Sequence, residues 1–442
     1  MKKLNIAVVG SGISGLSAAW LLSKHHQVTL YEAGSYLGGH ANTVDVKTPD
    51  GVVAVDTGFI VFNKPNYPNL TAMFEHLHAA SEQTEMSFAL SVNHGEYEYA
   101  GSGANGFFGQ RRNIFKTSHW KLLSEISRFF RTAQQRIENY PLQTTLGMFL
   151  KSEQYSEAFI TDHIIPMGAA IWSTAVEDML GFPAIGFIKF YANHGMLQFN
   201  NRPEWSTVSG GSREYIKKIV SDSDLEIHLN TPIKRINRKS DYVYITDHNN
   251  VARQFDHVVI ATHADQALKL LHQPDPYEIA LLSPFKYQLN RAVLHSDHRW
   301  MPKRRSLWSS WNFLKQGYGL QTRLCLTYWM NRLQSLNTET NLFVTLNPGA
   351  EIHPKAVNAA YNYYHPVFST AAIQAQHRLW SLQGRQRTWF CGSYFGSGFH
   401  EDGAQAGLAV AEQLGGFQRP WTLTNPSDRI KVEIPAALEA AL

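Results

Sequence analysis

Three glycines and one glutamate near the start of the 442-residue chain have the types and spacing to bind a diphosphate. Gly10, Gly12 and Gly15 follow a short apolar segment, and Glu32 stands about 20 residues further on. The first glycine permits a tight turn, the second lets backbone N–H groups approach a diphosphate, and the third allows a helix and a strand to pack closely. The carboxylate of Glu32 can accept both ribose hydroxyls of an adenosine. These residues therefore predict a dinucleotide site.

The elements around these residues have the order that such a site needs. Asn5 to Val9 and Gln27 to Tyr31 are apolar segments that predict buried strands. Leu16 to Ser23 has helical character and begins just after Gly15. Strand, glycine turn, helix and strand form a βαβ unit, which implies a parallel sheet covered by helices.

Two further groups of strands are expected later in the chain. Glu226 to Leu229, Tyr242 to Thr246 and His257 to Ala261 are separated by polar turns and predict an antiparallel meander. Arg323 to Trp329 and Leu342 to Leu346 predict part of another, aromatic-rich sheet.

The segment from Glu75 to about Phe187 is predicted to be mostly helical. Within it, a helix from His119 to Tyr140 has an apolar face and basic residues around it. The apolar face would carry Trp120, Leu123, Ile126, Phe129 and Phe130, and the basic residues are Lys121, Arg128, Arg131 and Arg136. Such a helix lies on a membrane surface or, more commonly, packs on its own domain. The basic groups Arg111-Arg112 and Lys303-Arg304-Arg305 are either solvated or meet lipid headgroups.

Composition narrows the class of protein. A chain of 442 residues with 44% hydrophobic and 17% charged residues predicts at least two domains. A net charge of +4 is too small for a nucleic-acid-binding protein, and no stretch has the length and apolarity of a transmembrane helix. Two cysteines, Cys325 and Cys391, form neither a disulfide framework nor a metal cage, so we expect no metal and a cytoplasmic location.

A second glycine pair follows Glu32 closely, in Gly38-Gly39-His40. Adjacent glycines indicate either another close approach of the backbone to a cofactor or an ordinary turn. Neither glycine motif by itself distinguishes NAD from FAD.

Taken with Val55-Asp56-Thr57-Gly58-Phe59, these motifs resemble those of the flavin amine oxidase, phytoene desaturase and protoporphyrinogen oxidase superfamily. The resemblance implies FAD in a Rossmann-type domain. Where the superfamily usually has arginine after the paired glycines, this sequence has His40.

Over nearly its whole length the chain is also similar to bacterial predicted FAD-binding proteins related to the N-terminal domain of plant cyclopropane fatty acid synthases. The motifs that carry this resemblance are Gly38-Gly39-His40-Ala41, Phe62-Asn63 with Tyr67-Pro68, Met86-Ser87-Phe88, Gly210-Gly211-Ser212-Arg213, Trp329-Met330-Asn331-Arg332 and Gly398-Phe399-His400-Glu401-Asp402-Gly403. This similarity implies a desaturase-like activity on methylated fatty acyl chains.

The resemblance also implies which residues contact FAD. The expected contacts are Gly10, Gly12, Ile13, Ser14, Gly15, Glu32, Ala33, Gly38, Gly39, His40, Thr57, Gly58, Phe59, Ile233, Ala261, Thr262, Gly392, Glu401, Asp402, Gly403 and Ala404. The turn at Gly210-Gly211 resembles one that returns a substrate-domain segment to FAD, and otherwise is a plain helix start.

A C-terminal helix from Gly403 to Leu414 is predicted to begin just after Glu401-Asp402. Its N-terminus would place a partial positive charge near the part of a flavin that gains electron density on reduction. Asp402 is otherwise only a helix cap. His400 lies at the flavin edge or is a structural histidine, and it joins Asn63 and Tyr67 as a candidate for the flavin-facing wall; no general base is assigned.

Several aromatic residues in the later sheet are candidates for a substrate tunnel. Large aromatic side chains suit a lipid or terpenoid chain, although an aromatic stripe is more often part of a core. The candidates are Trp308, Trp311, Asn312, Tyr328 and Trp329.

Together these features predict an α/β fold, with a Rossmann-type FAD domain of the glutathione-reductase-like, amine oxidase type and an α+β substrate domain carrying a mixed sheet. The FAD domain is expected in residues 1–75, 200–270 and 385–420, the substrate domain in 76–199 and 271–384, and a C-terminal tail in 421–442. The expected function is oxidation or desaturation of a fatty acyl or other lipid-like substrate by hydride transfer to flavin N5. Alternatives are an amine oxidase, a redox-neutral fatty acyl isomerase, and a non-catalytic flavin-binding partner of a lipid methyltransferase. Peripheral membrane contact and such a methyltransferase partner are also expected.

Overall fold

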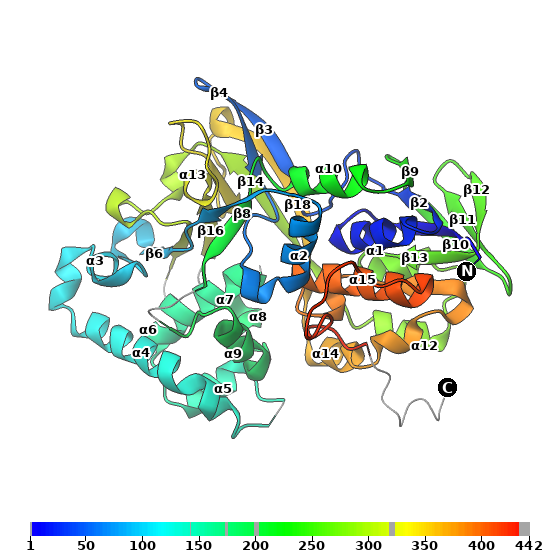
Figure 1. Cartoon of the computed structure of the whole chain (residues 1–442). Helices are drawn as coiled ribbons and strands as arrows, with labels where there is room; N and C mark the ends of the chain where they lie inside the picture. The colour runs from blue at the N-terminus through cyan, green and yellow to red at the C-terminus, as the bar shows by residue number, and fades with distance from the viewer. Residues whose placement is uncertain (1, 142, 173–175, 199–202, 318–322, 433–442) are drawn as a thin grey trace.

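The computed structural model describes residues 2–141, 143–172, 176–198, 203–317 and 323–432. Two lobes lie side by side, and the N-terminus belongs to the lobe that contains α1 and α15 (Figure 1). Each lobe is built on its own sheet, so the architecture has the mixed α/β character that the sequence predicts.

The first lobe contains a five-stranded, all-parallel sheet in the order β19-β13-β1-β2-β9. Its strands are β1 (Asn5–Val9), β2 (Gln27–Tyr31), β9 (Leu225–His228), β13 (His257–Ile260) and β19 (Thr388–Phe390). β1 and β2 match the predicted bounds, and β1 is central because its apolar side chains are buried on both faces. All five strands fall within the three segments assigned to an FAD domain; the division into domains remains a proposal.

Two long helices cover one face of this sheet and pack against each other: α1 (Ile13–Ser23) and α15 (His400–Gly415) (Figure 1). Every residue of α1 is buried. The helices approach so closely that a Cβ added at Gly407 would lie 2.1 Å from the carbonyl oxygen of Ser14. Glycine is therefore required at this crossing.

The predicted antiparallel meander is wrong in two of its three strands. Glu226 to Leu229 and His257 to Ala261 correspond to β9 and β13, which are parallel strands of the main sheet. The antiparallel sheet lies between them in the chain and consists of β10 (Ile233–Arg238), β11 (Val243–Asp247) and β12 (Ala252–Phe255). This three-stranded sheet, rather than a helix, connects the parallel strands β9 and β13. The lack of a helix between two strands therefore did not mean that the strands are antiparallel.

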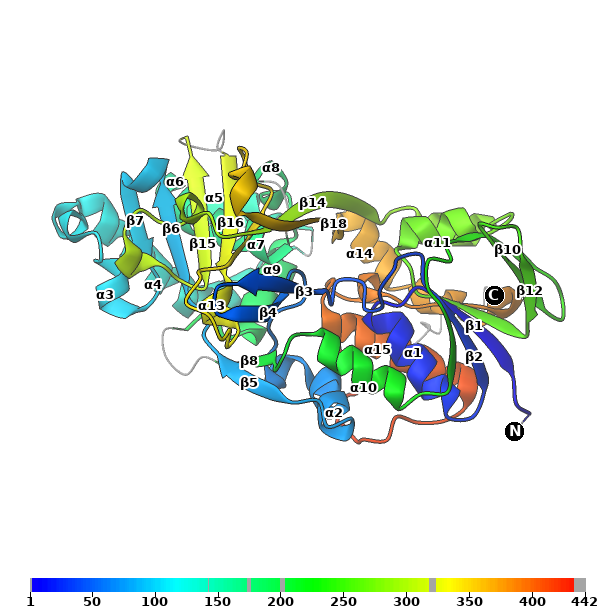
Figure 2. The same ribbon diagram turned by 90° about the horizontal axis from the view of Figure 1, so that it is seen from above.

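The second lobe contains a seven-stranded mixed sheet in the order β18-β14-β17-β16-β15-β6-β7. Its strands are β6 (Phe88–Val92), β7 (Tyr97–Ala100), β14 (Lys286–His295), β15 (Trp311–Gln316), β16 (Arg323–Trp329), β17 (Phe343–Leu346) and β18 (Val357–Val367). The strands predicted at residues 323–329 and 342–346 are thus present in one sheet. The long pair β14 and β18 extends toward the first lobe (Figure 2).

Most helices of the second lobe come from one continuous part of the chain. They are α3 (Gly103–Phe107), α4 (Thr117–Ile137), α5 (Leu146–Ser152), α6 (Glu157–Phe159), α7 (Ile165–Trp172), α8 (Val176–Met179) and α9 (Ala184–Asn193). The prediction of a mostly helical segment from Glu75 is wrong at its start, where β5 (Ser81–Thr84), β6 and β7 precede the helices. β5 and β6 gain stability from pairing with the distant strands β8 (Trp205–Val208) and β15, which a local pattern does not reveal.

The long helix α4 buries a face that differs from the predicted one. Ile126 and Phe129 are buried as expected, together with Leu122 and Ala133. Trp120, which was predicted on that face, is 49% exposed. The buried residues recur at three- and four-residue intervals from Leu122, and Trp120 falls off that stripe.

The remaining elements connect the lobes or cover the main sheet, except for one short helix, α13 (Met330–Leu333), which packs on β16 and β17. They are the hairpin β3 (Thr43–Thr48) and β4 (Gly51–Asp56), the strand β8 (Trp205–Val208) paired with β5, and the helices α2 (Pro68–His76), α10 (Arg213–Ser221), α11 (Ala264–Leu270), α12 (Pro276–Leu282), α13 (Met330–Leu333) and α14 (Thr370–Gln376). Within the described ranges, none of the helices combines the length and the apolarity needed to cross a bilayer.

Candidate functional site

A cavity of about 790 Å³ has walls from both lobes. Most of the residues predicted to contact a dinucleotide line it. They are Gly10, Gly12, Ile13, Ser14, Glu32, Ala33, Gly38, Gly39, His40, Thr57, Gly58, Phe59, Ile233, Ala261, Thr262 and Gly392. Segments that are up to several hundred residues apart in the chain therefore share one wall, because β1, β2, β13 and β19 all end at the same edge of the parallel sheet.

The first glycine loop has the geometry that its sequence predicts. Gly10 has φ of +102°, a conformation that a side chain would strain. A Cβ at Gly15 would lie 1.9 Å from the carbonyl oxygen of Gly10, so this glycine allows α1 to begin directly beneath the turn. A Cβ at Gly12, in contrast, would have no neighbour within 4 Å. Since Gly12 lines the cavity, its open side faces the space where a ligand would lie.

Glu32 holds the glycine loop in place. Its Oε2 atom accepts hydrogen bonds from the backbone N–H of Ser11 at 3.0 Å and from the Ser11 hydroxyl at 2.5 Å, and its Oε1 accepts one from the N–H of Gly34 at 2.7 Å. Each carboxylate oxygen can accept more than one hydrogen bond. Glu32 therefore both organises the loop and presents acceptors at the cavity wall, where a ribose would bind.

The residues present fit FAD. The first N–H groups of α1 have no partners within the helix, and Gly12 caps that helix without a side chain. The Nε2 atom of His40 is buried without a hydrogen-bond partner although the residue lines the cavity. Unpaired donors, a positive helix end and a glycine with open space beside it form a site for a diphosphate. Gly10, Gly12, Gly39 and His40 would hold the diphosphate, and Glu32 the adenosine ribose.

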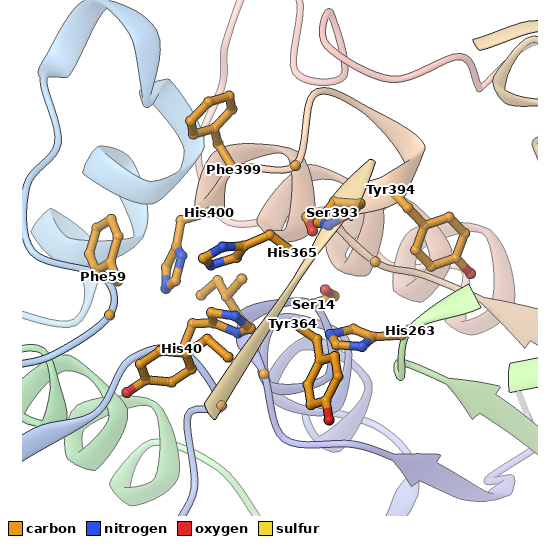
Figure 3. Close-up of a pocket in the computed structure, with 18 of the residues that line it drawn as sticks. Ser14, His40, Phe59, His263, Tyr364, His365, Ser393, Tyr394, Phe399 and His400 are labelled. Atoms are coloured by element: carbon orange, nitrogen blue, oxygen red, sulfur yellow. The ribbon is translucent and has the colours of Figure 1, made fainter. Parts of the chain in front are cut away.

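Four histidines line the middle of the cavity: His40, His263, His365 and His400 (Figure 3). The ring of His40 lies 5.2 Å from that of His365 and 6.4 Å from that of His263. Burial lowers the pKa of His365 to about 4 and that of His400 to about 3. Burial and the neighbouring histidines hold the pKa of His40 well below its usual range, and burial lowers that of His263. The four rings are therefore neutral near pH 7, and each can donate one N–H.

His263 and His365 were missed by the sequence analysis. They belong to segments far apart in the chain, at the end of β13 and on β18, and only the fold brings them to His40. The run of aromatic residues Tyr361, Tyr363, Tyr364 and His365 on β18 was the available signal, because alternate residues of a strand share one face.

His400 lies in the cavity wall, as one of its two predicted roles requires. Its ring stacks on Phe59, with centroids 3.8 Å apart, and its Nε2 lies 3.2 Å from the Tyr215 hydroxyl. Both neighbours are buried, so the ring is fixed between the loop that follows β4 and α10. Tyr67 also lines the cavity. Asn63 does not, because its side-chain oxygen accepts hydrogen bonds from Asn66 and caps a short helical turn.

The acidic pair at the start of α15 has structural contacts. The helix begins at His400 rather than Gly403, so Glu401 and Asp402 lie in its first turn. Glu401 accepts hydrogen bonds from the backbone N–H groups of Asn69 and Leu70, at the start of α2.

Asp402 is not the helix cap itself. Its carboxylate accepts a hydrogen bond from the N–H of Phe399, at 2.7 Å, and pairs with Arg429. Gly403 packs on Ile13 and Ser14. Glu401, Asp402, Gly403 and Ala404 are therefore not part of the cavity wall.

The turn at Gly210-Gly211 is a structural connection outside the cavity wall. A Cβ at Gly211 would lie 2.5 Å from Thr43, so the turn packs directly on β3. Asp56 accepts hydrogen bonds from the N–H and hydroxyl of Ser212. Burial raises the pKa of Asp56 to about 6. These contacts position α10, and α10 in turn supplies the Tyr215 that contacts His400.

Two of the five predicted substrate-lining residues reach the cavity. Trp311 and Tyr328 are paired across β15 and β16, and both line it. Trp308 and Trp329 lie elsewhere, where their indole N–H groups donate to Pro302 and Asn341, respectively. Asn312 alternates with Trp311 along the strand, so its buried amide points away and bonds to backbone groups.

Trp311 and Tyr328 belong to an extended apolar end of the cavity. The rest of its wall comes from α4, α7, α9, α13, the strands β6, β8 and β17, and neighbouring loops. The sequence analysis proposed none of these side chains as lining residues. The main side chains are Met86, Phe88, Phe130, Met167, Ile171, Phe190, Met196, Trp205, Leu333, Leu346, Phe368 and Phe399.

The model of the family described as flavin containing amine oxidoreductase matches residues 13–332 of this chain. Three solved structures are similar in fold at low sequence identity. The CLA-producing fatty acid isomerase from P. acnes has a TM-score of 0.66 and 14% identity, over 94% of this chain and 99% of that one. Putrescine oxidase has a TM-score of 0.65 and 15% identity, over 94% of this chain and 100% of that one. Cyclohexylamine oxidase from Brevibacterium oxydans has a TM-score of 0.62 and 13% identity, over 93% of this chain and 100% of that one.

Proposed function

The chain belongs to the family of flavin-containing amine oxidoreductases and is an FAD-dependent oxidoreductase, and from this premise we propose that it oxidises or desaturates a fatty acyl chain or a similar lipid. The observation that carries the proposal is the apolar end of the cavity. It is continuous with the end that the glycine loop and Glu32 line, and it is built almost entirely from aromatic and aliphatic side chains. Such a wall suits a hydrocarbon chain.

The charges of the cavity favour a lipid over an amine. Among the described residues that line the cavity, only Glu32 and Lys269 have charged side chains. The histidines of the wall are neutral because burial lowers their pKa values. Glu32 lies at the nucleotide end, where it bonds to the glycine loop. A polyamine would leave its ammonium groups buried without a carboxylate partner, which is costly. Amine oxidation is therefore the second candidate, supported by the family and by the two amine oxidases of similar fold.

FAD, which Gly10, Gly12, Gly39, His40 and Glu32 would hold, would supply two-electron oxidation of the acyl chain, with oxygen or a quinone as the final oxidant. The protein's own residues exclude water and orient the chain. Trp311 and Tyr328 form one apolar wall, and the stacked pair Phe59 and His400 fixes another. His400 is neutral and cannot act as a cation there, because burial lowers its pKa to about 3.

Several finer statements belong to the same proposal. The motifs shared with proteins related to the N-terminal domain of plant cyclopropane fatty acid synthases support a methylated acyl chain as substrate and a fatty acid methyltransferase as partner. A cytoplasmic protein that meets membrane lipids at their surface is consistent with that substrate. A flavin-binding partner without turnover and a redox-neutral isomerase are the remaining alternatives.

The proposal is tested by mixing the FAD-loaded protein anaerobically with methylated phospholipids, unmodified phospholipids, putrescine and an aromatic amine. We expect loss of the oxidised flavin absorbance with acyl lipids, and a product two mass units lighter, since two hydrogens are lost. Bleaching by an amine alone would overturn the lipid assignment. An altered lipid of unchanged mass, with no net bleaching, would indicate an isomerase. No change with any lipid, together with a stable methyltransferase complex, would indicate a non-catalytic partner.

A further inference from the structure

A group of exposed apolar side chains lies at the end of the second lobe that is remote from the parallel sheet. It belongs to the connection between α3 and α4 and to the first turn of α4, which both views place at the outer edge of the molecule (Figures 1 and 2). Phe115 is 88% exposed, Trp120 49% and Ile114 41%. Phe115 is more exposed than any other large hydrophobic residue that the structure describes. Single exposed apolar residues scattered over a surface are normal, but three within one short segment form a patch of the kind that marks an interaction site.

These side chains are held in place. The Trp120 indole N–H donates to the carbonyl oxygen of Ile114 at 2.9 Å, which ties the start of α4 to the preceding helical turn, Arg111–Phe115. The ring of Phe108 lies 4.9 Å from that of Trp120. The exposure is therefore a feature of an ordered surface rather than of a loose loop.

Basic residues surround the apolar ones. Between Gly101 and Ile137 the sequence has seven lysines and arginines and a single acidic residue, Glu125. Glu125 is buried and accepts hydrogen bonds from Ser156, so it adds no exposed negative charge. Glu96, on the neighbouring connection between β6 and β7, is an exposed acid nearby. We call the surface the basic-aromatic patch; it consists of Phe108, Arg111, Arg112, Ile114, Phe115, Lys116, Trp120 and Lys121.

We propose that the basic-aromatic patch docks the protein on the surface of an anionic phospholipid bilayer. Phe115, Ile114 and Trp120 enter the boundary between headgroups and acyl chains, where aromatic side chains are favoured. Arg111, Arg112, Lys116 and Lys121 lie at headgroup level and attract negatively charged lipids. The patch combines both features that reversible membrane binding needs: apolar groups that leave water and cations that neutralise anionic headgroups.

The patch is connected through α4 to the apolar end of the cavity, where a lipid substrate would bind. α4 begins at the patch, and Phe130 in its second half lines the apolar end of the cavity. Met167 and Ile171 of α7 continue that wall. Docking would thus place the apolar end of the cavity nearer the bilayer than the nucleotide end. Binding to a bilayer does not require turnover, so it is measured independently of the proposed oxidation.

The experiment is co-sedimentation of the full-length, FAD-loaded protein with sucrose-filled vesicles. One set contains phosphatidylcholine alone, and the other contains three parts phosphatidylcholine to one part phosphatidylglycerol. We expect the protein to sediment with the second set at low salt, and much less with the first set or at high salt, because screening weakens the attraction between exposed charges.

Two double variants test the two components of the patch. Ile114→Ser with Phe115→Ser removes apolar groups, and Arg111→Glu with Lys121→Glu reverses charges; we expect each to weaken vesicle binding about tenfold. The matched controls change exposed residues of the same kinds elsewhere. Val52→Ser with Val251→Ser, and Lys217→Glu with Lys218→Glu, should bind as the wild type does. Retained flavin absorbance and an unchanged Tm show that each variant is folded.

Three results would overturn the proposal. The wild type could remain in the supernatant with phosphatidylglycerol vesicles, or the control variants could lose as much binding as the patch variants. The third is a dimer in light scattering that Ile114→Ser with Phe115→Ser converts to a monomer, which would make the patch an interface between two copies of this chain. Flavin reduction by detergent-dispersed lipid, by contrast, tests only the proposed oxidation.

Discussion

The two ends of the cavity are built in different ways. At the nucleotide end, backbone groups and glycines form the wall: Gly10 needs its positive φ, and Gly12 leaves open space that a side chain would fill. At the apolar end, the wall consists of large side chains such as Trp311 and Phe190, which come from a strand and from a helix.

This difference explains why one end is visible in the sequence and the other is not. A diphosphate requires backbone N–H groups in one local geometry, and few sequences produce it. A hydrocarbon chain requires only apolar atoms of suitable size, and many combinations of residues supply them. Substitutions at the nucleotide end should therefore have larger and more specific effects than substitutions at the apolar end.

The largest effect is expected for Gly15→Ala. The added methyl group would lie 1.9 Å from the carbonyl oxygen of Gly10, so the turn and α1 must separate. We expect a loss of about 3 kcal/mol or more in the free energy of unfolding, as for strong overpacking of a core. Urea unfolding of the FAD-free protein measures this loss. A variant as stable as the wild type would show that the close contact is not needed.

Gly12→Ala should separate cofactor binding from folding. Its methyl group would meet no protein atom within 4 Å but would occupy space in the cavity. We expect the unfolding of the FAD-free protein to stay unchanged and the affinity for FAD to fall about a hundredfold, which corresponds to about 3 kcal/mol. Titration with FAD, followed by flavin fluorescence, measures the affinity. Unchanged affinity would place the diphosphate elsewhere.

The histidines of the cavity predict a dependence of stability on pH. Because burial lowers the pKa of His365 to about 4, the unfolded chain, with its histidine near 6.5, binds this proton more readily than the folded one. The stability from keeping His365 neutral is complete above pH 6.5 and is lost as the pH falls toward 4. At pH 5 the loss from this group is about 2 kcal/mol.

The variant His365→Gln isolates this contribution. Between pH 6.5 and pH 5, the unfolding free energy of the FAD-free variant should fall less steeply than that of the wild type. The difference in slope should correspond to about one proton fewer taken up on unfolding. Trp311→Ala, at the apolar end, should keep the wild-type slope. Equal slopes in all three proteins would contradict a buried neutral His365.

The smallest effect is expected at the apolar end. Trp311→Ala should lower kcat/KM for a lipid substrate about tenfold, mainly through KM, because one apolar wall is lost. The FAD content should stay unchanged, since Trp311 is not at the nucleotide end. Trp329→Ala is the matched control: this indole bonds to Asn341 outside the cavity, so kcat/KM should be retained while Tm falls. Equal kinetic losses in both variants would show that the wall is not specific.

Prediction from the sequence alone succeeded where one short segment contains all the information. β1 and β2 have the predicted bounds, and α1 is present but begins at Ile13, before Gly15, rather than at Leu16. It failed where a residue's neighbours decide its role. Trp329 of β16 occupies the sheet face opposite to that of Trp311 and Tyr328, and Asp402 contacts Arg429 rather than the cavity.

The sequence by itself determined that a glycine turn joins a buried strand to a helix, because Gly10 has a positive φ and Gly15 has no room for a Cβ. Only the tertiary structure decided which side chains meet across the cavity. His40, His263 and His365 come from three distant segments, and the order of strands in the parallel sheet, together with the reach of β18, brings them together. Strand order depends on long-range packing, which no local pattern of residues specifies.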